Sequence, residues 1–344
     1  MHIIKEVRTI CTKPLIRAET HERYKNKKGG TSYKVEWLQR DIWDRRKENH
    51  KFLAKYRRVQ EIPCGQCIEC RLNYSREWAT RCMLELKYWN PKTCWFLTLT
   101  YDDEHLRFHE SVNTETGEIE TGQSLYKKDM QDFWKRVRKH YKVQGMKYIT
   151  AGEYGSQTMR PHYHAIVYGL PLNISNMKRI GINSQGDPYF ENEELAKIWG
   201  KGYVTIGEVT WQSAAYVARY SLKKAKGSSP EQLKAMGKLP EFVTMSQGIG
   251  KRYFNENKEN IYKSDTVPVL NTKTGQLVKP PKSYDRLLKE VDEQLYNSIK
   301  LNRERSRDTQ ETLIQKQTDL NPEQRRKKKE EIIKKQFQDI RREI

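Results

Sequence analysis

The chain has 344 residues and carries 65 Lys and Arg against 44 Asp and Glu, a formal net charge of +21. Such an excess of cations makes nucleic acid the first partner to consider and an anionic membrane surface the second. No stretch approaches the roughly 20 apolar residues of a membrane span, and the N-terminus has no apolar signal core, so the sequence argues against a membrane or secreted protein and favours a soluble intracellular one.

Residues 1–92 form a strongly basic part of the chain. They contain 22 Lys and Arg against 11 Asp and Glu. Cations beside flat rings suit a phosphate backbone with stackable bases. Aromatic residues are interleaved with the cations here, among them Tyr24, Tyr33, Trp37, Trp43, Phe52 and Tyr56. A solvated basic surface over a few core aromatics would look the same, but the positive charge of the whole chain favours nucleic-acid binding.

Three regularly spaced cysteines lie near the end of this region, in Cys64-Gly65-Gln66-Cys67-Ile68-Glu69-Cys70. In a chain without a secretion signal, this spacing favours metal binding over disulfides. Structural Zn²⁺ takes four ligands, so a fourth must come from elsewhere, with Cys11 as the first choice and Cys82 as the second. The alternatives are three reduced structural cysteines or an iron–sulfur cluster.

From residue 93 the apolar pattern predicts alternating strands and helices. The β-branched and aromatic run 94–101 predicts a buried strand, 109–123 a loop or hairpin insertion, and the apolar stripe of 125–142 a helix. Strands are also predicted at 148–151 and 162–168. The connection between these two is too short for a helical crossover, so they should be antiparallel neighbours.

The next part of the chain continues this pattern. Its predicted elements are a polar segment at 172–190, a helix at 193–199, a strand at 203–209 and a helix at 211–225. Their order fits an α+β fold, an antiparallel sheet with helices packed on one face. We therefore expect a catalytic domain over 93–226. The basic, Cys-rich region 1–92 precedes it, and 227–344 follows as a linker and then a charged, largely helical C-terminal region.

A histidine pair marks the first candidate site, in Pro161-His162-Tyr163-His164. Successive side chains of a strand point to opposite faces, so His162 and His164 share one face. A tight hairpin return would bring Glu153, on the preceding strand, beside them. Two histidines and a carboxylate can hold a catalytic divalent ion and leave coordination positions open. The alternative is two ordinary surface histidines and an unrelated glutamate, because His-x-His often arises by chance.

A tyrosine pair marks the second candidate site. On a helical wheel Tyr220 lies about 40° from Tyr216, and Arg219 and Lys223 lie on the same side. The small apolar residues between them occupy the opposite arc, which separates the tyrosines from a core-packing face. A phenol has a pKa of about 10 and must be activated before it attacks, and adjacent cations would favour the phenolate. These positions therefore predict a nucleophile site.

Three motifs, taken in order, resemble those of the HUH endonucleases, which are rolling-circle replication initiators. They are Phe96-Leu97-Thr98-Leu99-Thr100-Tyr101, Arg160-Pro161-His162-Tyr163-His164 and Tyr216-Val217-Ala218-Arg219-Tyr220-Ser221-Leu222-Lys223. The two-tyrosine form is similar to the initiators of small circular single-stranded-DNA phages. The cysteine knuckle and Gly152-Glu153-Tyr154-Gly155 look like the gokushovirus branch of the microviruses, and the match covers about residues 64–224.

This resemblance implies an RRM-like palm as the fold and a DNA-nicking chemistry. His162 and His164, with Glu153, would hold Mg²⁺ or Mn²⁺ against the scissile phosphate. Tyr216 or Tyr220 would attack, leaving a 5′-phosphotyrosine and a free 3′-OH, and the other tyrosine would cut again so that the released strand can be circularised. At the family's lysine position, Lys223 would position a tyrosine or stabilise a leaving oxygen.

The resemblance also implies partners and a location. The partners are single-stranded origin DNA and the host helicase and polymerase, and the location is the host bacterial cytoplasm. The sequence has no G-x-x-x-x-G-K-[ST] loop, which agrees with a rejoining step that needs no ATP. The alternatives are an HUH transposase or relaxase, and a non-catalytic zinc-knuckle protein that binds DNA or RNA.

Overall fold

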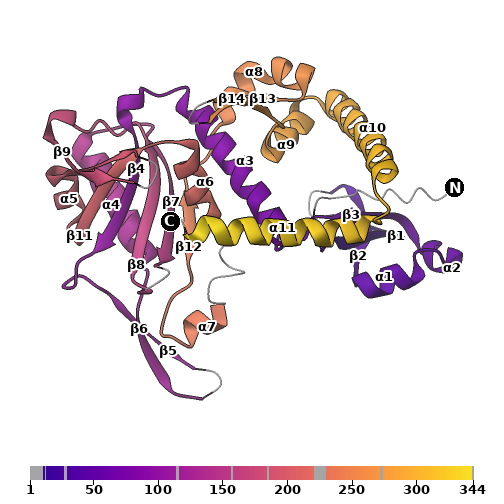
Figure 1. Ribbon diagram of the computed structural model, residues 1–344, viewed down its shortest axis with the longest axis horizontal. Coiled ribbons are helices and arrows are strands. Elements are labelled where there is room, and N and C mark those ends of the chain that lie inside the picture. The colour runs from indigo at the N-terminus through magenta and orange to yellow at the C-terminus, as the bar shows by residue number, and fades with distance from the viewer. Residues whose placement is uncertain are drawn as a thin grey trace. The chain divides into compact units, whose positions relative to one another are not determined.

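The structure is a computed structural model that describes residues 11, 13–26, 29–113, 116–155, 158–183, 186–220, 230–271 and 274–342 (Figure 1). The chain separates into two compact units, Tyr74–Thr309 and a smaller one made of Met1–Asn73 with Gln310–Ile344. The division at residues 92 and 226 stays a prediction, because units defined by packing need not coincide with functional regions. In the described part of the chain, no helix is both long enough and apolar enough to cross a bilayer.

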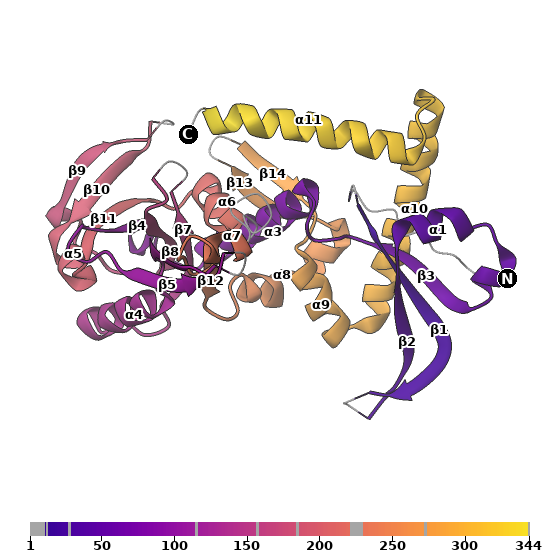
Figure 2. The same cartoon turned by 90° about the horizontal axis from the view of Figure 1, so that it is seen from below.

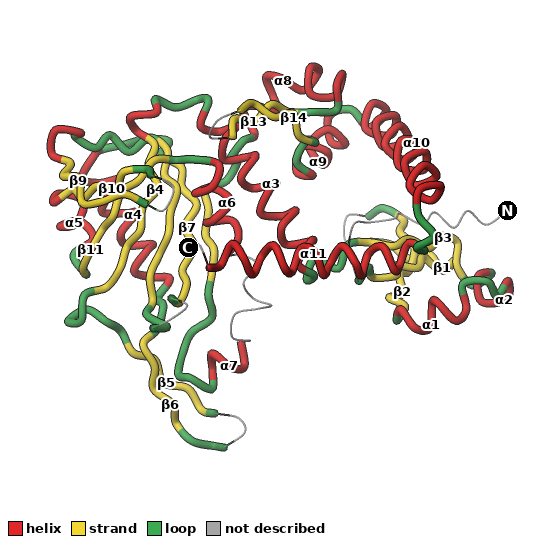
Figure 3. The backbone as a smooth tube through the Cα atoms, viewed as in Figure 1, coloured by secondary structure: helices red, strands yellow, loops and turns green. Residues whose placement is uncertain are grey.

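The larger unit is built on a seven-stranded antiparallel sheet with the strand order β12-β7-β8-β4-β11-β10-β9 (Figure 3). The strands are β4 (Cys94–Tyr101), β7 (Lys147–Tyr154), β8 (Pro161–Tyr168), β9 (Met177–Ile182), β10 (Pro188–Asn192), β11 (Gly202–Glu208) and β12 (Phe242–Met245). As predicted, β7 and β8 are antiparallel neighbours.

Helices cover both faces of this sheet (Figure 2). They are α4 (Lys127–Tyr141) and α5 (Glu193–Trp199) on one face, and α3 (Ile68–Leu86) and α6 (Trp211–Tyr220) on the other. The predicted α+β antiparallel sheet is confirmed, but the expectation of helices on one face is wrong. The reason lies in strand β8, where Tyr163, Ala165 and Val167 are buried toward α4 and α5. Ile166 and Tyr168 are buried toward α3 and α6, so both faces need a cover.

Two hairpins extend the sheet architecture. The predicted insertion is the hairpin β5 (Phe108–Val112) and β6 (Ile119–Gln123), which projects from the sheet (Figure 1). The predicted polar segment 172–190 instead contains β9 and most of β10. Residues 178–182 of β9 are all exposed, so the segment has no alternating apolar face to reveal a strand. Short 3-10 turns, η1 (Pro91–Thr93) and η2 (Ile174–Asn176), complete this part.

The chain after residue 226 adds to the larger unit. Strand β12 pairs with β7 at the sheet edge. The other elements are α7 (Pro230–Lys234), α8 (Lys251–Ser264), β13 (Val267–Asn271), β14 (Thr274–Val278), α9 (Lys282–Val291) and the long α10 (Glu293–Gln317). A core of Tyr253, Phe254, Tyr284 and Leu288 joins α8 and α9 to Leu84 of α3.

The smaller unit contains a three-stranded antiparallel sheet, ordered β2-β1-β3. Its elements are β1 (Leu15–Lys25), β2 (Thr31–Leu38), α1 (Arg40–Arg46), α2 (His50–Leu53), β3 (Tyr56–Ile62) and α11 (Pro322–Arg342). Helix α11, at the predicted helical C-terminus, carries the basic run 325–329. Two of its cations form ion pairs, Arg326 with Glu61 at 3.2 Å and Lys329 with Glu69 at 2.8 Å, so the run is more than a solvated face.

Candidate metal and nucleophile site

The candidate site lies on the face of the large sheet that α6 covers. His162 and His164 belong to β8, and Glu153 of β7 is directly opposite His162 across the ladder. Thr98 of β4 is directly opposite His164. Residues that face each other in an antiparallel ladder project to the same side. Three neighbouring strands therefore deliver their side chains to one spot.

The two histidines converge on a single carboxylate oxygen. Glu153 Oε1 lies 2.7 Å from His162 Nε2 and 2.9 Å from His164 Nε2. The Glu153 residue is 1% exposed and His164 is 6% exposed. A buried carboxylate is costly unless charged or hydrogen-bonding groups surround it, and the imidazoles provide these. The three ligand atoms lie within 4.8 Å of one another.

Both rings are also held from behind. His162 Nδ1 lies 3.0 Å from the backbone carbonyl of Arg160. Since a carbonyl oxygen only accepts, Nδ1 carries the proton, and in the neutral ring Nε2 keeps its lone pair. His164 Nδ1 lies 3.0 Å from the Thr98 hydroxyl. Histidine ligands of metals are typically held in this way, with the far nitrogen bound to a carbonyl or another polar group.

This donor set fits a divalent cation. Nε2 of a histidine can face a carboxylate oxygen at hydrogen-bond distance only if Nε2 is protonated, and a cation between them would replace that proton. Two imidazole nitrogens and one carboxylate suit first-row divalent ions and leave other coordination positions for water or a substrate oxygen. The sequence-predicted residues Glu153, His162 and His164 are therefore brought together.

Tyr216 of α6 reaches the same carboxylate. Its hydroxyl donates to Glu153 Oε1 at 3.3 Å. Its ring stands edge-on to the His164 ring, with the centroids 4.9 Å apart. Phe96 of β4 stacks on the other side of this contact, parallel to the His164 ring with centroids 5.7 Å apart. The phenol therefore has a defined place beside the candidate metal ligands.

Helix α6 presents its two faces as the wheel predicts for the part that is described. Ala214, Ala215, Val217 and Ala218 are buried, with the first three packed against the sheet. The Ser75 hydroxyl of α3 donates to the carbonyl of Ala215 at 2.8 Å and ties the two helices together. Because these apolar residues face the sheet core, Tyr216 is turned toward the strand end that carries His162.

Two predicted catalytic residues lie at the limit of the description. Tyr220 is the last residue of α6, and the structure describes neither its side chain nor that of Arg219. Lys223 falls in 221–229, outside the described residues. Their roles stay predictions.

Sequence reasoning missed two residues of this site, Thr98 and Phe96. Both were quoted only as part of a strand motif without a role. Their signal is the alternation of β4, in which Trp95, Leu97 and Leu99 are buried toward α4 and α5. That alternation sends Phe96 and Thr98 to the histidine face. The missing information was the pairing of β4 with β8.

A second cluster, in the smaller unit, gathers four cysteines. Cys11 Sγ lies 3.4 Å from Cys64 Sγ and 3.7 Å from Cys67 Sγ. With Cys70 the four sulfur atoms lie within 4.8 Å of one another. Disulfide sulfurs are about 2.05 Å apart, whereas a tetrahedral ion with Zn–S bonds of about 2.3 Å has sulfur edges of about 3.8 Å. The spacing fits four ligands of one metal ion.

The surroundings of the cysteine cluster agree with this fit. Backbone N–H groups of Gln66 and Cys67 donate to Cys64 Sγ at 3.3 and 3.2 Å. Burial raises the pKa of Cys70 to about 11, so its thiolate needs a cation beside it at neutral pH. The first choice for the fourth position, Cys11, joins the cluster. The second choice, Cys82, is buried in the core of the larger unit.

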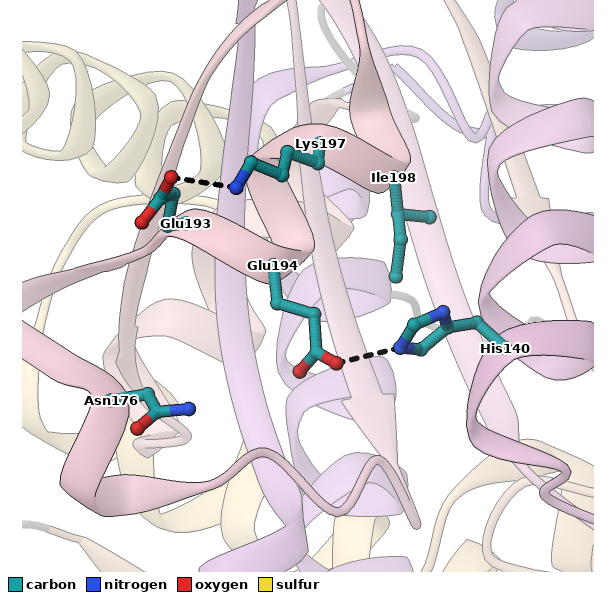
Figure 4. A pocket seen from close by; sticks show the side chains of 6 residues that line it. All are labelled: His140, Asn176, Glu193, Glu194, Lys197 and Ile198. Carbon is teal, nitrogen blue, oxygen red and sulfur yellow. Dashed lines mark hydrogen bonds and ion pairs between the residues drawn. The ribbon is translucent and has the colours of Figure 1, made fainter.

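A cavity of about 620 Å³ lies elsewhere on the larger unit, beside α4, η2 and α5 (Figure 4). It is lined by His140, Asn176, Glu193, Glu194, Lys197 and Ile198. Its charged groups pair with each other, His140 with Glu194 and Lys197 with Glu193, each at 2.7 Å. The lining therefore has no excess of positive charge, and it does not suit a nucleic acid.

Comparison with known proteins gives the class of this molecule. A family profile for the replication-associated protein ORF2 and its relatives matches residues 94–225, which hold the sheet and the candidate site. The replication-associated protein ORF2 of Spiroplasma virus 4 is 38% identical over 261 residues, 74% of this chain and 76% of that protein. The chain therefore belongs to this family of replication-associated proteins.

Further relatives narrow the group. The replication-associated protein VP4 of Bdellovibrio phage phiMH2K is 31% identical over 218 residues, 63% of this chain and 64% of that protein. The replication-associated protein ORF4 of Chlamydia phage 1 is 29% identical over 254 residues, 70% of this chain and 58% of that protein. The chain is thus a replication-associated protein of microvirus-type phages, as the resemblance predicted. No solved structure matches the chain.

Proposed function

We propose that this protein starts rolling-circle replication by nicking single-stranded origin DNA with a tyrosine and later rejoining the ends. One observation carries the proposal. The Tyr216 hydroxyl lies 3.3 Å from the Glu153 oxygen that both histidine Nε2 atoms approach. A nucleophile and a set of metal ligands in one place are what a metal-assisted phosphoryl transfer requires.

Glu153, His162 and His164 would hold Mg²⁺ or Mn²⁺. When bound there, the ion would orient the scissile phosphate and screen the charge that develops on its oxygens. The Arg160 carbonyl and the Thr98 hydroxyl keep the two rings turned so that Nε2 faces the ion. Burial of Glu153 excludes water and strengthens the attraction between its charge and a bound cation.

The chemistry is a transesterification. The phenol oxygen of Tyr216 or Tyr220 attacks the phosphorus and loses its proton, for which Glu153 Oε1 is an acceptor within reach of Tyr216. The bond from phosphorus to the 3′ oxygen breaks, and that oxygen takes up a proton to become the free 3′-OH. The 5′-phosphotyrosine keeps the ester, so the reverse attack rejoins the strand without ATP. The second tyrosine would make the cut that ends a round, and Lys223 would stabilise a leaving oxygen.

This function sets the partners. A host polymerase would extend the free 3′-OH in the bacterial cytoplasm. A host helicase would open the duplex, because the sequence contains no phosphate-binding loop of the Walker type. Binding to origin DNA follows from the same role and agrees with the net charge of +21.

The cysteine cluster would hold a structural Zn²⁺. Four thiol sulfurs complete a closed tetrahedral set and leave no position for a substrate, which is typical of a structural site. The ion would join Cys11 to the start of α3 across more than 50 residues of chain, and so stabilise the smaller unit.

The experiment is the capture of the covalent intermediate. Purified protein with Mn²⁺ and a single-stranded origin oligonucleotide should form an adduct at the 5′ side of the nick, which peptide mass assigns to Tyr216 or Tyr220. The double variant Tyr216→Phe/Tyr220→Phe should form no adduct. His162→Ala/His164→Ala should lose at least about a hundredfold in cleavage rate, because an oriented, charge-screened phosphate is lost.

The matched control is Tyr203→Phe, an exposed tyrosine of β11 that is 69% accessible, and its adduct yield should equal that of the wild type. An adduct that persists in the double tyrosine variant would contradict the nucleophile assignment. If wild-type protein binds the oligonucleotide but never becomes attached to it, the better description is a non-catalytic nucleic-acid-binding protein, which the cysteine cluster and the basic composition would then explain.

A further inference from the structure

The β2-β1-β3 sheet of the smaller unit has one covered face and one open face. Ile16 and Ala18 of β1 and Val59 of β3 are buried with Trp43 of α1 and Phe52 of α2, which close the first face (Figure 1). Their neighbours in the strands therefore point to the other side. Trp37, which is directly opposite Arg17 across the β1–β2 ladder, is on that side and is 59% exposed.

The open face carries flat rings along one strand. Tyr33 and Trp37 are four residues apart on β2, so they share a face and lie about 13 Å from each other. A tryptophan that is more than half exposed on a sheet face is out of place in a surface that contacts only water. Rings displayed on an antiparallel sheet are a common means of stacking the bases of a single strand.

Guanidinium groups surround these rings. Arg57 lies over the Tyr33 ring at 4.1 Å, and Arg23 lies 5.4 Å from the same ring. Arg17 and Arg58 flank Glu19 on the same face, since Arg58 is opposite Glu19 in the β1–β3 ladder. Glu19 binds Arg17 at 2.6 Å and Arg57 at 3.3 Å. One carboxylate among four guanidinium groups leaves a positive face.

We propose that this face, made by Trp37, Tyr33 and Arg17, Arg23, Arg57 and Arg58, is a second DNA-binding surface that holds single-stranded DNA by stacking and phosphate contacts. The choice of DNA rests on the proposed function, since the nicked substrate is a single DNA strand. The charge complementarity and the exposed ring are independent of the catalytic residues, which belong to the other compact unit.

The test measures binding of the full chain to a labelled dT20 oligonucleotide, which contains no origin sequence, by fluorescence anisotropy. Trp37→Ala should weaken binding on the order of tenfold, because one stacked base is lost. Trp37→Phe should recover part of the loss. The matched control is Tyr24→Ala, an aromatic residue of the same sheet that is 53% exposed. Tyr24 is opposite Ser32 and next to Arg23 in β1, so it points away from the open face, and its loss should change the affinity less than twofold.

A charge pair of variants tests the phosphate contacts. Arg58→Gln should lower the slope of log affinity against log salt by about 0.7, the value for one phosphate contact on a single strand. Arg45→Gln is its control, because Arg45 lies on α1 and pairs with Asp41, and the slope should stay as in the wild type.

Three results would overturn the proposal: equal affinities of Trp37→Ala and Tyr24→Ala for dT20, duplex DNA bound as tightly as dT20, or U20 RNA bound more tightly than dT20. Failure of the proposed function is seen separately. It is a wild-type protein that forms no adduct with origin DNA, whatever its affinity for dT20.

Discussion

At the scale of single residues, the candidate site depends on how the two histidine rings are turned. His162 is held by a backbone carbonyl, that of Arg160, which no side-chain substitution removes. His164 is held by the Thr98 hydroxyl. The two rings therefore differ in how far their orientation can be tested by substitution, and Thr98 is the residue to change.

We expect Thr98→Val to weaken metal binding without removing a ligand. Valine keeps the volume of threonine, but His164 Nδ1 loses its partner and the ring is free to turn. Loss of such a partner typically costs about 10- to 100-fold in metal affinity. The Mn²⁺ concentration that gives half-maximal cleavage should rise on the order of tenfold, while the rate at saturating Mn²⁺ changes less.

Thr98→Ser is the conservative control, because it restores the hydroxyl and should restore the metal dependence. An unchanged Mn²⁺ requirement in Thr98→Val would show that the Thr98 hydroxyl does not position His164.

At the scale of elements, the site is a consequence of strand register. Glu153 meets His162, and Thr98 meets His164, only because β7, β8 and β4 pair as they do. A slip of one residue would turn Glu153 to the α4 face, since neighbours in a strand point to opposite sides. Whatever holds the outer strands against β4 therefore also holds the site.

We expect Gly202→Ala to disturb this register from the far side of β4. Gly202 opens β11 with a φ of +132°, which favours glycine. An added Cβ would lie 2.3 Å from the backbone nitrogen of Asp102 and 2.5 Å from the carbonyl oxygen of Thr100. The start of β11 must then move away from β4, and the free energy of unfolding should fall by about 2 kcal/mol or more.

Gly181→Ala, in the edge strand β9, is the matched control. No atom lies within 4 Å of the Cβ added there, and the change in unfolding free energy should stay within about 0.5 kcal/mol. Urea denaturation followed by circular dichroism measures both variants. Equal stabilities for the two would contradict the close packing of β11 on β4.

At the scale of the whole molecule, the chain combines two compact units with different candidate chemistries. The larger one carries the histidine site, and the smaller one carries the cysteine cluster and the open face of the three-stranded sheet. Cys11 joins Cys64 over a separation of 53 residues. The choice between Cys11 and Cys82 as fourth ligand is therefore a statement about which parts of the chain fold together.

We expect the purified full chain to retain one Zn²⁺ after dialysis against a weak chelator, measured by elemental mass spectrometry. Cys11→Ser and Cys67→Ser should each lose most of it, because three thiolates bind the ion more weakly than four. Cys82→Ala should keep the full amount, since its sulfur is buried in the other unit. Zinc content that is unchanged in Cys11→Ser would remove Cys11 from the set of ligands.

The accuracy of the predictions follows from what each pattern contains. Strand β8 alternates histidines with buried Tyr163, Ala165 and Val167, so its faces could be read from sequence, and helix α4 shows the same clarity in its apolar stripe. Strands β9 and β10 escaped prediction because an exposed edge hairpin has no buried face to impose a period. The smaller sheet was also missed, because its open face places arginine and tryptophan where an apolar residue would have completed the alternation.

The sequence by itself determined the ligand types, the nucleophile candidates and the family, because these depend on residue identity at short spacing: His162 with His164, Tyr216 with Tyr220, and Cys64 with Cys67 and Cys70. Only the tertiary structure decided which distant residues join them. Strand pairing brought Glu153 and Thr98 to the histidines, helix packing brought Tyr216 to Glu153, and folding of the N-terminal segment brought Cys11 to the knuckle. Those contacts depend on hydrogen-bond register and core packing between segments far apart in the chain, and no local pattern contains that information.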